Sequence, residues 1–294
     1  MKTILVPTDF SPNADNALHY AINLANHLQG KVILLHNVEN PVDYTGAGVG
    51  GFATSDPLLS ATPVYPPAFN QGDALQHISE DRLNELVLKL RQTTSVALES
   101  TTVAGSLTDN LNNLVREQRV DLVVMGTKGA TNFLERIIGS NTASYMQVAV
   151  CPVLAVPAKA TFSKWERIAY AFELERTGGT FLNQLFSLTD SFSPAINLIT
   201  VESKFELDIV PDHQIMEDIK NKFPNRNITF TKRESDYPAQ VLEEFALSQQ
   251  MDILAVAIIN RGFLESFIHS SVSEKLVFQS VVPVLSLPEH PYKA

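Results

Sequence analysis

The sequence predicts two doubly wound α/β domains in tandem, each a five-stranded parallel sheet in the order 3-2-1-4-5 with helices on both faces. Three observations lead to this fold: short apolar runs alternate with segments of helical spacing, the alternation occurs twice, and 294 residues suit two ordinary domains. Strands that are apolar along their whole length and separated by helices are typical of parallel sheets joined by right-handed crossovers.

The first predicted domain covers residues 1–158. Its strands are expected at 3–7, 31–38, 95–103, 121–126 and 152–156, and its helices at 12–28, 73–92, 109–118 and 140–148. Between the second strand and the second helix, residues 41–72 are rich in Gly, Pro, Ser and Thr and have no periodicity. We expect a long loop there, which acts as a lid or is simply disordered.

The second predicted domain covers residues 164–290 and repeats the order of elements. Its strands are expected at 167–172, 195–201, 227–233, 252–258 and 283–287, and its helices at 177–189, 211–222, 237–250 and 270–279. The linker at 158–165 is short and contains no long flexible tract. We therefore expect the two domains to pack tightly against each other.

Three local matches indicate that the chain arose by internal duplication. The segment DLVVMG at 121–126 matches DILAVA at 252–257, and FLERIIGS at 133–140 matches FLESFIHS at 263–270 with one residue deleted in between. Each copy then closes alike, with CPVLAVP at 151–157 and VPVLSLP at 282–288. Duplication explains three matches in the same order better than chance does.

Charge and composition exclude several classes of protein. A net charge of −10 without clustered Lys and Arg argues against binding to a nucleic acid backbone. The chain has no apolar run of about 18 residues and no signal-peptide layout at its start, so we expect a cytoplasmic protein rather than a membrane protein. The single cysteine, Cys151, excludes an internal disulfide and is expected to be a small buried hydrophobe.

The most informative motif is formed by three glycines, Gly126, Gly129 and Gly139, in the spacing Gly-x2-Gly-x9-Gly-Ser. It follows a predicted strand and leads into a predicted helix. Glycines let the backbone approach a ligand closely, and the amides at a helix start attract phosphate oxygens. In the alternative interpretation the glycines only serve turns, with Gly126 closing a strand and Gly139 relieving a crowded helix start.

A carboxylate follows the first strand, at the edge where open α/β sheets bind their ligands. In the order 3-2-1-4-5 the first and fourth strands are neighbours, so Asp9 is expected close to Gly126 and Gly129 across one crevice. Asp9 could bind a ribose hydroxyl, an adenine amine or a metal-bound water. The alternative is that Asp9 is the N-cap of the following helix, and both roles can hold together.

The end of the second strand borders the same crevice. There, exposed backbone groups around Asn37 could read the edge of a base. His36, by contrast, is expected to be an ordinary packed strand residue rather than a ligand or a base.

These motifs together resemble one known family. The opening ILVPTDFS at 4–11, the strand LLH at 34–36, the glycine spacing and CPVL at 151–154 resemble the universal stress protein family, in its ATP-binding subgroup. The resemblance covers nearly all of the first domain except 41–72, and most of the second in weaker form. It implies a Rossmann-like, adenine nucleotide alpha hydrolase-like fold that binds ATP with Mg²⁺ or Mn²⁺.

The resemblance also implies roles for individual positions. Pro7, Thr8 and Asp9 would lie by the adenosine, and the backbone at Asn37 would contact adenine. The phosphates would be held by residues of the glycine motif, namely Gly126, Gly129, Gly139, Ser140 and Asn141, with Lys128 and Thr142 beside them. The family pairs domains through the last strand, so 152–156 and 283–287 would join the two halves as a pseudo-dimer, and similar proteins commonly form homodimers.

The second domain departs from this pattern at the glycines. The positions of Gly126, Gly129 and Gly139 are taken by Ala257, Asn260 and His269, and Glu173 stands roughly where Asp9 does. Each replacement adds a Cβ where the backbone would approach phosphate, so we expect no nucleotide bound in the same manner. Weaker alternatives are another anion at Arg261, His269 and Ser270, or a metal at Asp212 and His213.

Three functions remain open at this point. The first is a module that binds one ATP per chain and reports nucleotide status during stress, the second is a slow ATPase, and the third is a scaffold that binds no nucleotide. The sequence offers no obvious residue to orient water for hydrolysis. A dinucleotide-binding dehydrogenase is excluded, because its glycine cluster should follow the first strand directly and TDFSP at 8–12 contains no glycine.

Overall fold

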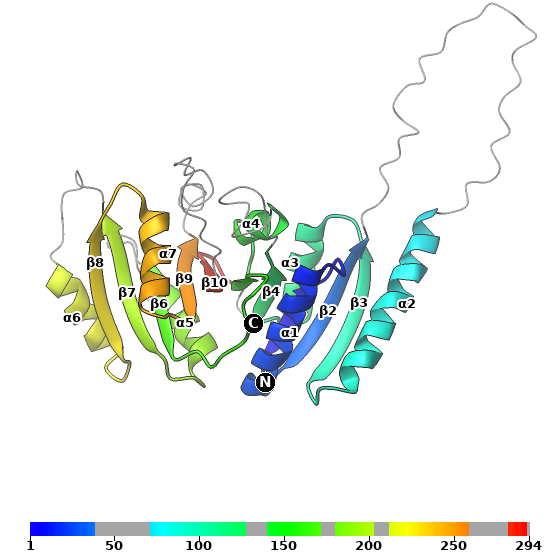
Figure 1. Ribbon diagram of the computed structural model, residues 1–294, viewed down its shortest axis with the longest axis horizontal. Helices are drawn as coiled ribbons and strands as arrows, with labels where there is room; N and C mark the ends of the chain where they lie inside the picture. The colour runs from blue at the N-terminus through cyan, green and yellow to red at the C-terminus, as the bar shows by residue number, and fades with distance from the viewer. Residues whose placement is uncertain (39–70, 128–139, 172–179, 203–211, 259–281, 293–294) are drawn as a thin grey trace, which may run out of the picture.

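The computed structural model describes residues 1–38, 71–127, 140–171, 180–202, 212–258 and 282–292 (Figure 1). The elements of the first half are β1 (Thr3–Pro7), α1 (Pro12–Leu28), β2 (Lys31–Val38), α2 (Gln71–Arg91), β3 (Ala97–Ala104), α3 (Leu107–Glu117), β4 (Leu122–Gly126), α4 (Ser140–Met146) and β5 (Val153–Val156). Those of the second half are β6 (Arg167–Ala171), α5 (Thr180–Thr189), β7 (Ala195–Glu202), α6 (Asp212–Lys222), β8 (Ile228–Glu234), α7 (Pro238–Ser248), β9 (Ile253–Ile258) and β10 (Val284–Pro288). The strand boundaries agree with the predicted ones to within two residues.

The strands form one ten-stranded sheet in the order β3-β2-β1-β4-β5-β10-β9-β6-β7-β8. Neighbouring strands within each half are parallel, and each half has the predicted order 3-2-1-4-5. The halves meet where β5 pairs with β10 in antiparallel register, with Leu154 opposite Leu285. Two parallel sheets are therefore joined edge to edge through their last strands.

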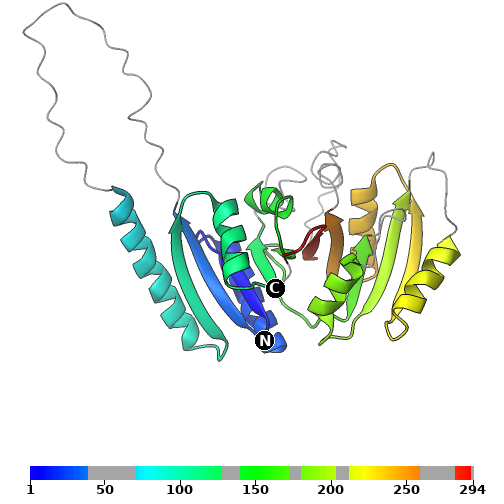
Figure 2. The ribbon, with the colours of Figure 1, turned by 180° about the vertical axis from the view of Figure 1, so that it is seen from behind.

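The crossover helices of the first half cover both faces of its sheet. Helices α1 and α2 pack with Ile4 and Val6 of β1 in one apolar cluster, whereas α3 and α4 pack with Leu5 in a second cluster. Figure 1 shows α1 in front of the sheet, and Figure 2 shows α3 in front from the reverse side. Because both faces are covered, the strands carry apolar side chains on both sides, which explains their unbroken apolar runs.

The linker between the halves is packed against α1. The Asn16 side-chain amide donates hydrogen bonds to the carbonyl oxygens of Pro157 and Ala160, at 2.9 and 3.1 Å. Trp165 is fully buried, and its indole Nε1 donates to the Tyr20 hydroxyl at 3.0 Å. These contacts hold the connecting segment against the first half, so the linker is part of the packed structure.

Serine caps set where two helices begin. The Ser11 hydroxyl accepts a hydrogen bond from the amide of Ala14, and the Ser106 hydroxyl accepts one from the amide of Asp109. Because Ser106 caps α3, this helix begins two residues earlier than helical spacing alone predicted. Helix α2 also begins earlier, so residues 71–72 of the predicted loop are helical. The rest of that loop and the predicted helix at 270–279 lie outside the described residues.

The predicted burial of the single cysteine is confirmed. Cys151 is 4% exposed, and burial raises the pKa of its thiol to about 12. Such a thiol is protonated at neutral pH and is therefore a poor nucleophile. In the described part of the chain, no helix has both the length and the apolar character needed to cross a membrane.

One buried carboxyl group couples stability to pH. Glu243 on α7 is 9% exposed, and within the described residues its Oε1 atom has no hydrogen-bond partner. Burial, with a smaller contribution from Glu244, raises the pKa of Glu243 to about 7. The folded chain therefore holds this proton more tightly than the unfolded chain does, and the free energy of unfolding falls as pH rises from about 4.5 to about 7.

We predict that Glu243→Gln stabilises the protein at pH 8, where the wild-type carboxyl is charged, by on the order of 2 kcal/mol. At pH 4 the wild-type carboxyl is neutral in the folded chain and largely neutral in the unfolded chain, so the two proteins should unfold nearly alike. Denaturant unfolding at both pH values measures the difference. Glu217→Gln, at an exposed glutamate of α6, is the control, and an equal effect of Glu243→Gln at both pH values would show that burial of charge is not the cause.

Candidate functional site

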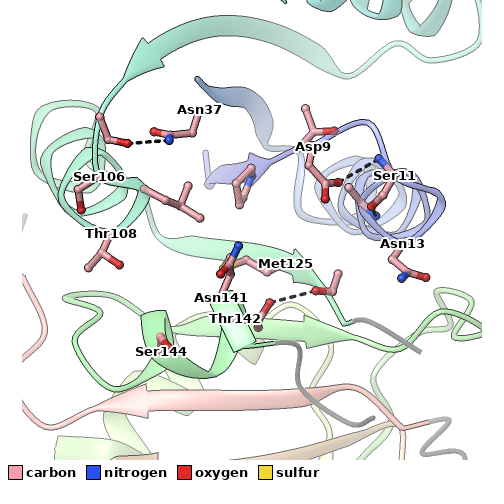
Figure 3. A pocket seen from close by; sticks show the side chains of 16 residues that line it. Asp9, Ser11, Asn13, Asn37, Ser106, Thr108, Met125, Asn141, Thr142 and Ser144 are labelled. Atoms are coloured by element: carbon pink, nitrogen blue, oxygen red, sulfur yellow. Dashed lines mark hydrogen bonds between the residues drawn. The ribbon is translucent and has the colours of Figure 1, made fainter. Parts of the chain in front are cut away.

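A pocket of about 350 Å³ opens at the carboxyl end of the first-half sheet (Figure 3). It lies between the ends of β1, β2, β3 and β4 and the starts of α1, α3 and α4. Its volume is in the range of small-molecule sites. The lining residues are Pro7, Thr8, Asp9, Ser11, Asn13, Ala14, Asn37, Gly105, Ser106, Leu107, Thr108, Met125, Gly126, Asn141, Thr142 and Ser144.

The turn after β1 is shaped by its own side chains. The Thr8 hydroxyl accepts a hydrogen bond from the amide of Phe10, and the Asp9 carboxylate accepts one from the amide of Ser11 at 2.9 Å. Phe10 takes a positive φ of 59° in this turn. The N-cap interpretation of Asp9 was wrong, because the cap of α1 is Ser11. Asp9 instead forms a turn that leaves it exposed at the pocket wall, as Figure 3 shows.

Gly126 ends β4 directly beneath the start of α1. A Cβ on this residue would lie 2.7 Å from the carbonyl carbon of Asn13 and 3.1 Å from the amide nitrogen of Ala14. Neither atom belongs to a side chain that could move aside. The close packing of α1 on β4 therefore requires glycine here, whether or not a ligand is bound, which neither the phosphate interpretation nor the turn interpretation predicted.

The start of α4 forms the floor of the pocket. Asn141 is exposed, and Thr142 is buried with its hydroxyl donating to the carbonyl oxygen of Gly126 at 3.0 Å. This hydrogen bond ties α4 to the end of β4, so the Thr142 side chain supports the floor. Ser140 is the first residue of α4. The other predicted phosphate-binding residues, Lys128, Gly129 and Gly139, lie outside the described residues.

The end of β2 offers backbone groups to the pocket. The carbonyl of Leu35 accepts a hydrogen bond from the amide of Thr8, on the side of β1. Backbone groups alternate sides along a strand, so the N–H and C=O of Asn37 face that side too, beyond the point where β1 ends at Pro7. His36 is half-buried, and its Nδ1 lies 2.8 Å from the Thr8 carbonyl oxygen, which fits the packed strand residue predicted.

Sequence reasoning missed one whole wall of the pocket, the segment 105–108 at the start of α3. A usable signal was present, because a glycine and a capping serine follow the third strand at the same carboxyl edge. Gly105 has a φ of 112°, which favours glycine. Sequence reasoning also missed lining residues that lie within a few positions of predicted ones. These are Ser11, Asn13, Met125 and Ser144.

The described lining carries one formal charge, that of Asp9. The first-turn amides of α1 and α3 provide partial positive charge at the opposite walls, because helix starts have unpaired N–H groups. Among the described residues, no group of three or more His, Cys, Asp or Glu side chains could hold a metal ion. His213 is exposed on α6.

Strand register locates the same positions in the second half. Gly126 pairs with Val156 of β5, and Ala257 pairs with Leu287 of β10, which agrees with the sequence match. By the same reasoning, Val201 occupies the position of Asn37 and Asp236 that of Ser106. The second half thus has the methyl group of Ala257 in place of the glycine and the apolar Val201 in place of the asparagine. It also has the carboxylate of Asp236 in place of the serine, near a helix start. Glu173, Asn260, Arg261, His269 and Ser270 lie outside the described residues.

Comparison with known proteins places this architecture. A model of the universal stress protein family matches residues 1–157. Universal stress protein MJ0577 of Methanocaldococcus jannaschii is 25% identical over 166 residues, which are 54% of this chain and 96% of that protein. A universal stress protein structure from Archaeoglobus fulgidus has a TM-score of 0.68 at 15% identity, covers 97% of this chain and 98% of its own, and so shows the same fold across both halves.

A further solved structure is a universal stress protein in complex with cAMP. It is 21% identical and covers 53% of this chain and 96% of its own, with a TM-score of 0.37.

The packing at Gly126 gives a direct prediction. Gly126→Ala should lower the free energy of unfolding by about 2–3 kcal/mol, because α1 must move away from β4 to admit the methyl group. Denaturant unfolding measures the loss. The reciprocal change Ala257→Gly, at the matching position of the second half, should cost only about 1 kcal/mol; a Gly126→Ala protein as stable as the wild type would contradict the packing argument.

Proposed function

Because the chain belongs to the universal stress protein family, we propose that its first half binds ATP together with Mg²⁺ or Mn²⁺, as a nucleotide-dependent sensor or signalling module of the stress response. The observation that carries this proposal is the convergence of Asp9, Asn37, Gly126 and Asn141 on one pocket, from four separate segments of the chain. A cytoplasmic location and further homodimerisation remain predictions that accompany it.

The nucleobase and ribose would lie between the turn after β1 and the end of β2. The N–H and C=O of Asn37 present a donor and an acceptor along one edge, which suits the donor and acceptor of an adenine edge. Guanine presents these groups in the opposite order on its corresponding edge. Pro7, Thr8 and Asp9 would contact the adenosine, with the exposed Asp9 carboxylate within reach of ribose hydroxyls.

The phosphates would lie at the glycine motif on the other side of the pocket. The residues proposed to hold them are Gly126, Gly129, Gly139, Ser140 and Asn141, with Lys128 beside them. Thr142 has a supporting role, since its hydroxyl already bonds the Gly126 carbonyl. A divalent cation brought by the nucleotide would offset part of the phosphate charge, together with the partial positive charge at the starts of α1 and α3.

The second half is proposed to bind no nucleotide in this manner and to act as a structural partner. Ala257 would hinder close approach of a phosphate, and the Asp236 carboxylate at a helix start would repel it. Antiparallel pairing of β5 with β10 supports the view that the two halves form an intramolecular pseudo-dimer of duplicated domains. One nucleotide per chain is the expected stoichiometry.

Isothermal titration of ATP with Mg²⁺ tests the proposal. The wild-type chain should bind one nucleotide, and Thr108→Trp, which fills the pocket from the first turn of α3, should weaken binding at least about tenfold. Asn113→Trp is the matched control, because Asn113 is an exposed residue of the same helix outside the pocket. Phosphate release measured in the same samples separates binding from slow hydrolysis.

Two results would contradict the proposal. Absence of binding by the wild-type chain, with ATP and either cation, would favour a scaffold that uses no nucleotide. Equal binding by wild type and Thr108→Trp would place the nucleotide outside this pocket.

A further inference from the structure

Two asparagine side chains form an amide pair at the missed wall of the pocket. The Asn110 side-chain nitrogen on α3 donates to the Asn37 side-chain oxygen at 2.8 Å and to the carbonyl oxygen of Ala104 at 3.1 Å. The Asn37 side-chain nitrogen donates in turn to the carbonyl oxygen of Gly105 at 2.8 Å. Both ends of the Asn37 amide are therefore engaged by protein atoms. We call these two residues the amide clamp.

The clamp holds the chain where β3 turns into α3. The amide of Gly105 donates to the carbonyl oxygen of Val38 in β2 at 3.1 Å. The carbonyl oxygen of Gly105 accepts a hydrogen bond from the Asn37 side chain, so both backbone groups of Gly105 are bonded. Gly105 itself has the positive φ that this turn needs. The residues that follow, 106–108, form the pocket wall (Figure 3).

The clamp also restrains the residue that carries the backbone edge. The Asn37 side chain is tied to Gly105 after β3 and to Asn110 of α3, while the Asn37 N–H and C=O face the side of β1, beyond its end. Pairing of β2 with β3 orients the Asn37 backbone, and the clamp adds a second restraint on the edge that would meet a base. At the matching position of the second half, Val201 can make neither hydrogen bond of the Asn37 amide.

We infer that Asn37 and Asn110 are positioning residues that set the base preference of the pocket, by holding the Asn37 backbone edge and the 105–108 wall in fixed relation. The inference rests on the proposed nucleotide function. Neither side chain needs to touch the ligand, because their amide groups are used within the protein. Loosening the clamp would let the N–H and C=O of Asn37 move, and these two groups distinguish the edge of adenine from that of guanine.

The test compares ATP and GTP, each with Mg²⁺, by titration into wild type, Asn37→Ala, Asn110→Ala and the double variant. Wild type should prefer ATP, and each single variant should reduce the ratio of ATP to GTP affinity by about tenfold, the value of one well-formed hydrogen bond. Because the two residues act as one unit, the double variant should lose no more than a single variant does. Asn113→Ala, an exposed asparagine on the same helix, should leave the ratio unchanged.

The outcomes are separable. If both nucleotides weaken equally in the variants, the clamp is merely structural and the inference fails while nucleotide binding stands. Unchanged affinities in Asn37→Ala and Asn110→Ala overturn it as well, and so do independent, additive losses in the double variant. Absence of binding by wild type identifies failure of the proposed function, and the inference falls with it. Thermal unfolding of each variant confirms that a loss of binding is measured on folded protein.

Discussion

The pocket exists because β1 and β4 are neighbours whose crossover helices leave on opposite faces of the sheet. Helix α1 departs to one apolar cluster and α4 to the other, so none of the described helices covers the carboxyl ends of these two strands. Side chains of the connecting turns then face a common crevice. The same winding brings the start of α3 to the third wall. Every described residue proposed to act at the site owes its position to this strand order.

The same constraint applies to the second half. The second half repeats the strand order, so it has the same topological switch point between β6 and β9. What differs is the surface presented there: Ala257, Val201 and Asp236 replace a glycine, an amide and a serine. None of these changes affects the apolar strands or the pairing of β10 with β5. The fold of the second half therefore does not depend on the residues that the first half presents at its switch point.

The sequence alone predicted the sheet order and strand boundaries well, because parallel strands buried on both faces have unbroken apolar sequences. It also brought Asp9, Asn37, Gly126 and Asn141 to one place, since strand ends in a parallel sheet share an edge. The sequence could not show why residue 126 must be glycine. The reason is its contact with the backbone of Asn13, and these two residues are distant in the chain. The wall at 105–108 was missed although its glycine and capping serine follow the third strand at the same carboxyl edge. No local pattern reveals how this wall is held, because Asn37 of another strand donates to the Gly105 carbonyl and Asn110 donates to Asn37.

We propose that this fold carries one nucleotide site per chain, at the switch point of the first half. A crystal structure of the full chain, grown with Mg²⁺ and a non-hydrolysable ATP analogue, would locate that site. We expect one analogue per chain, with its base beside the Asn37 backbone and its phosphates at the start of α4. An analogue bound at the second-half switch point, or outside the pocket between β1 and β4, would contradict it.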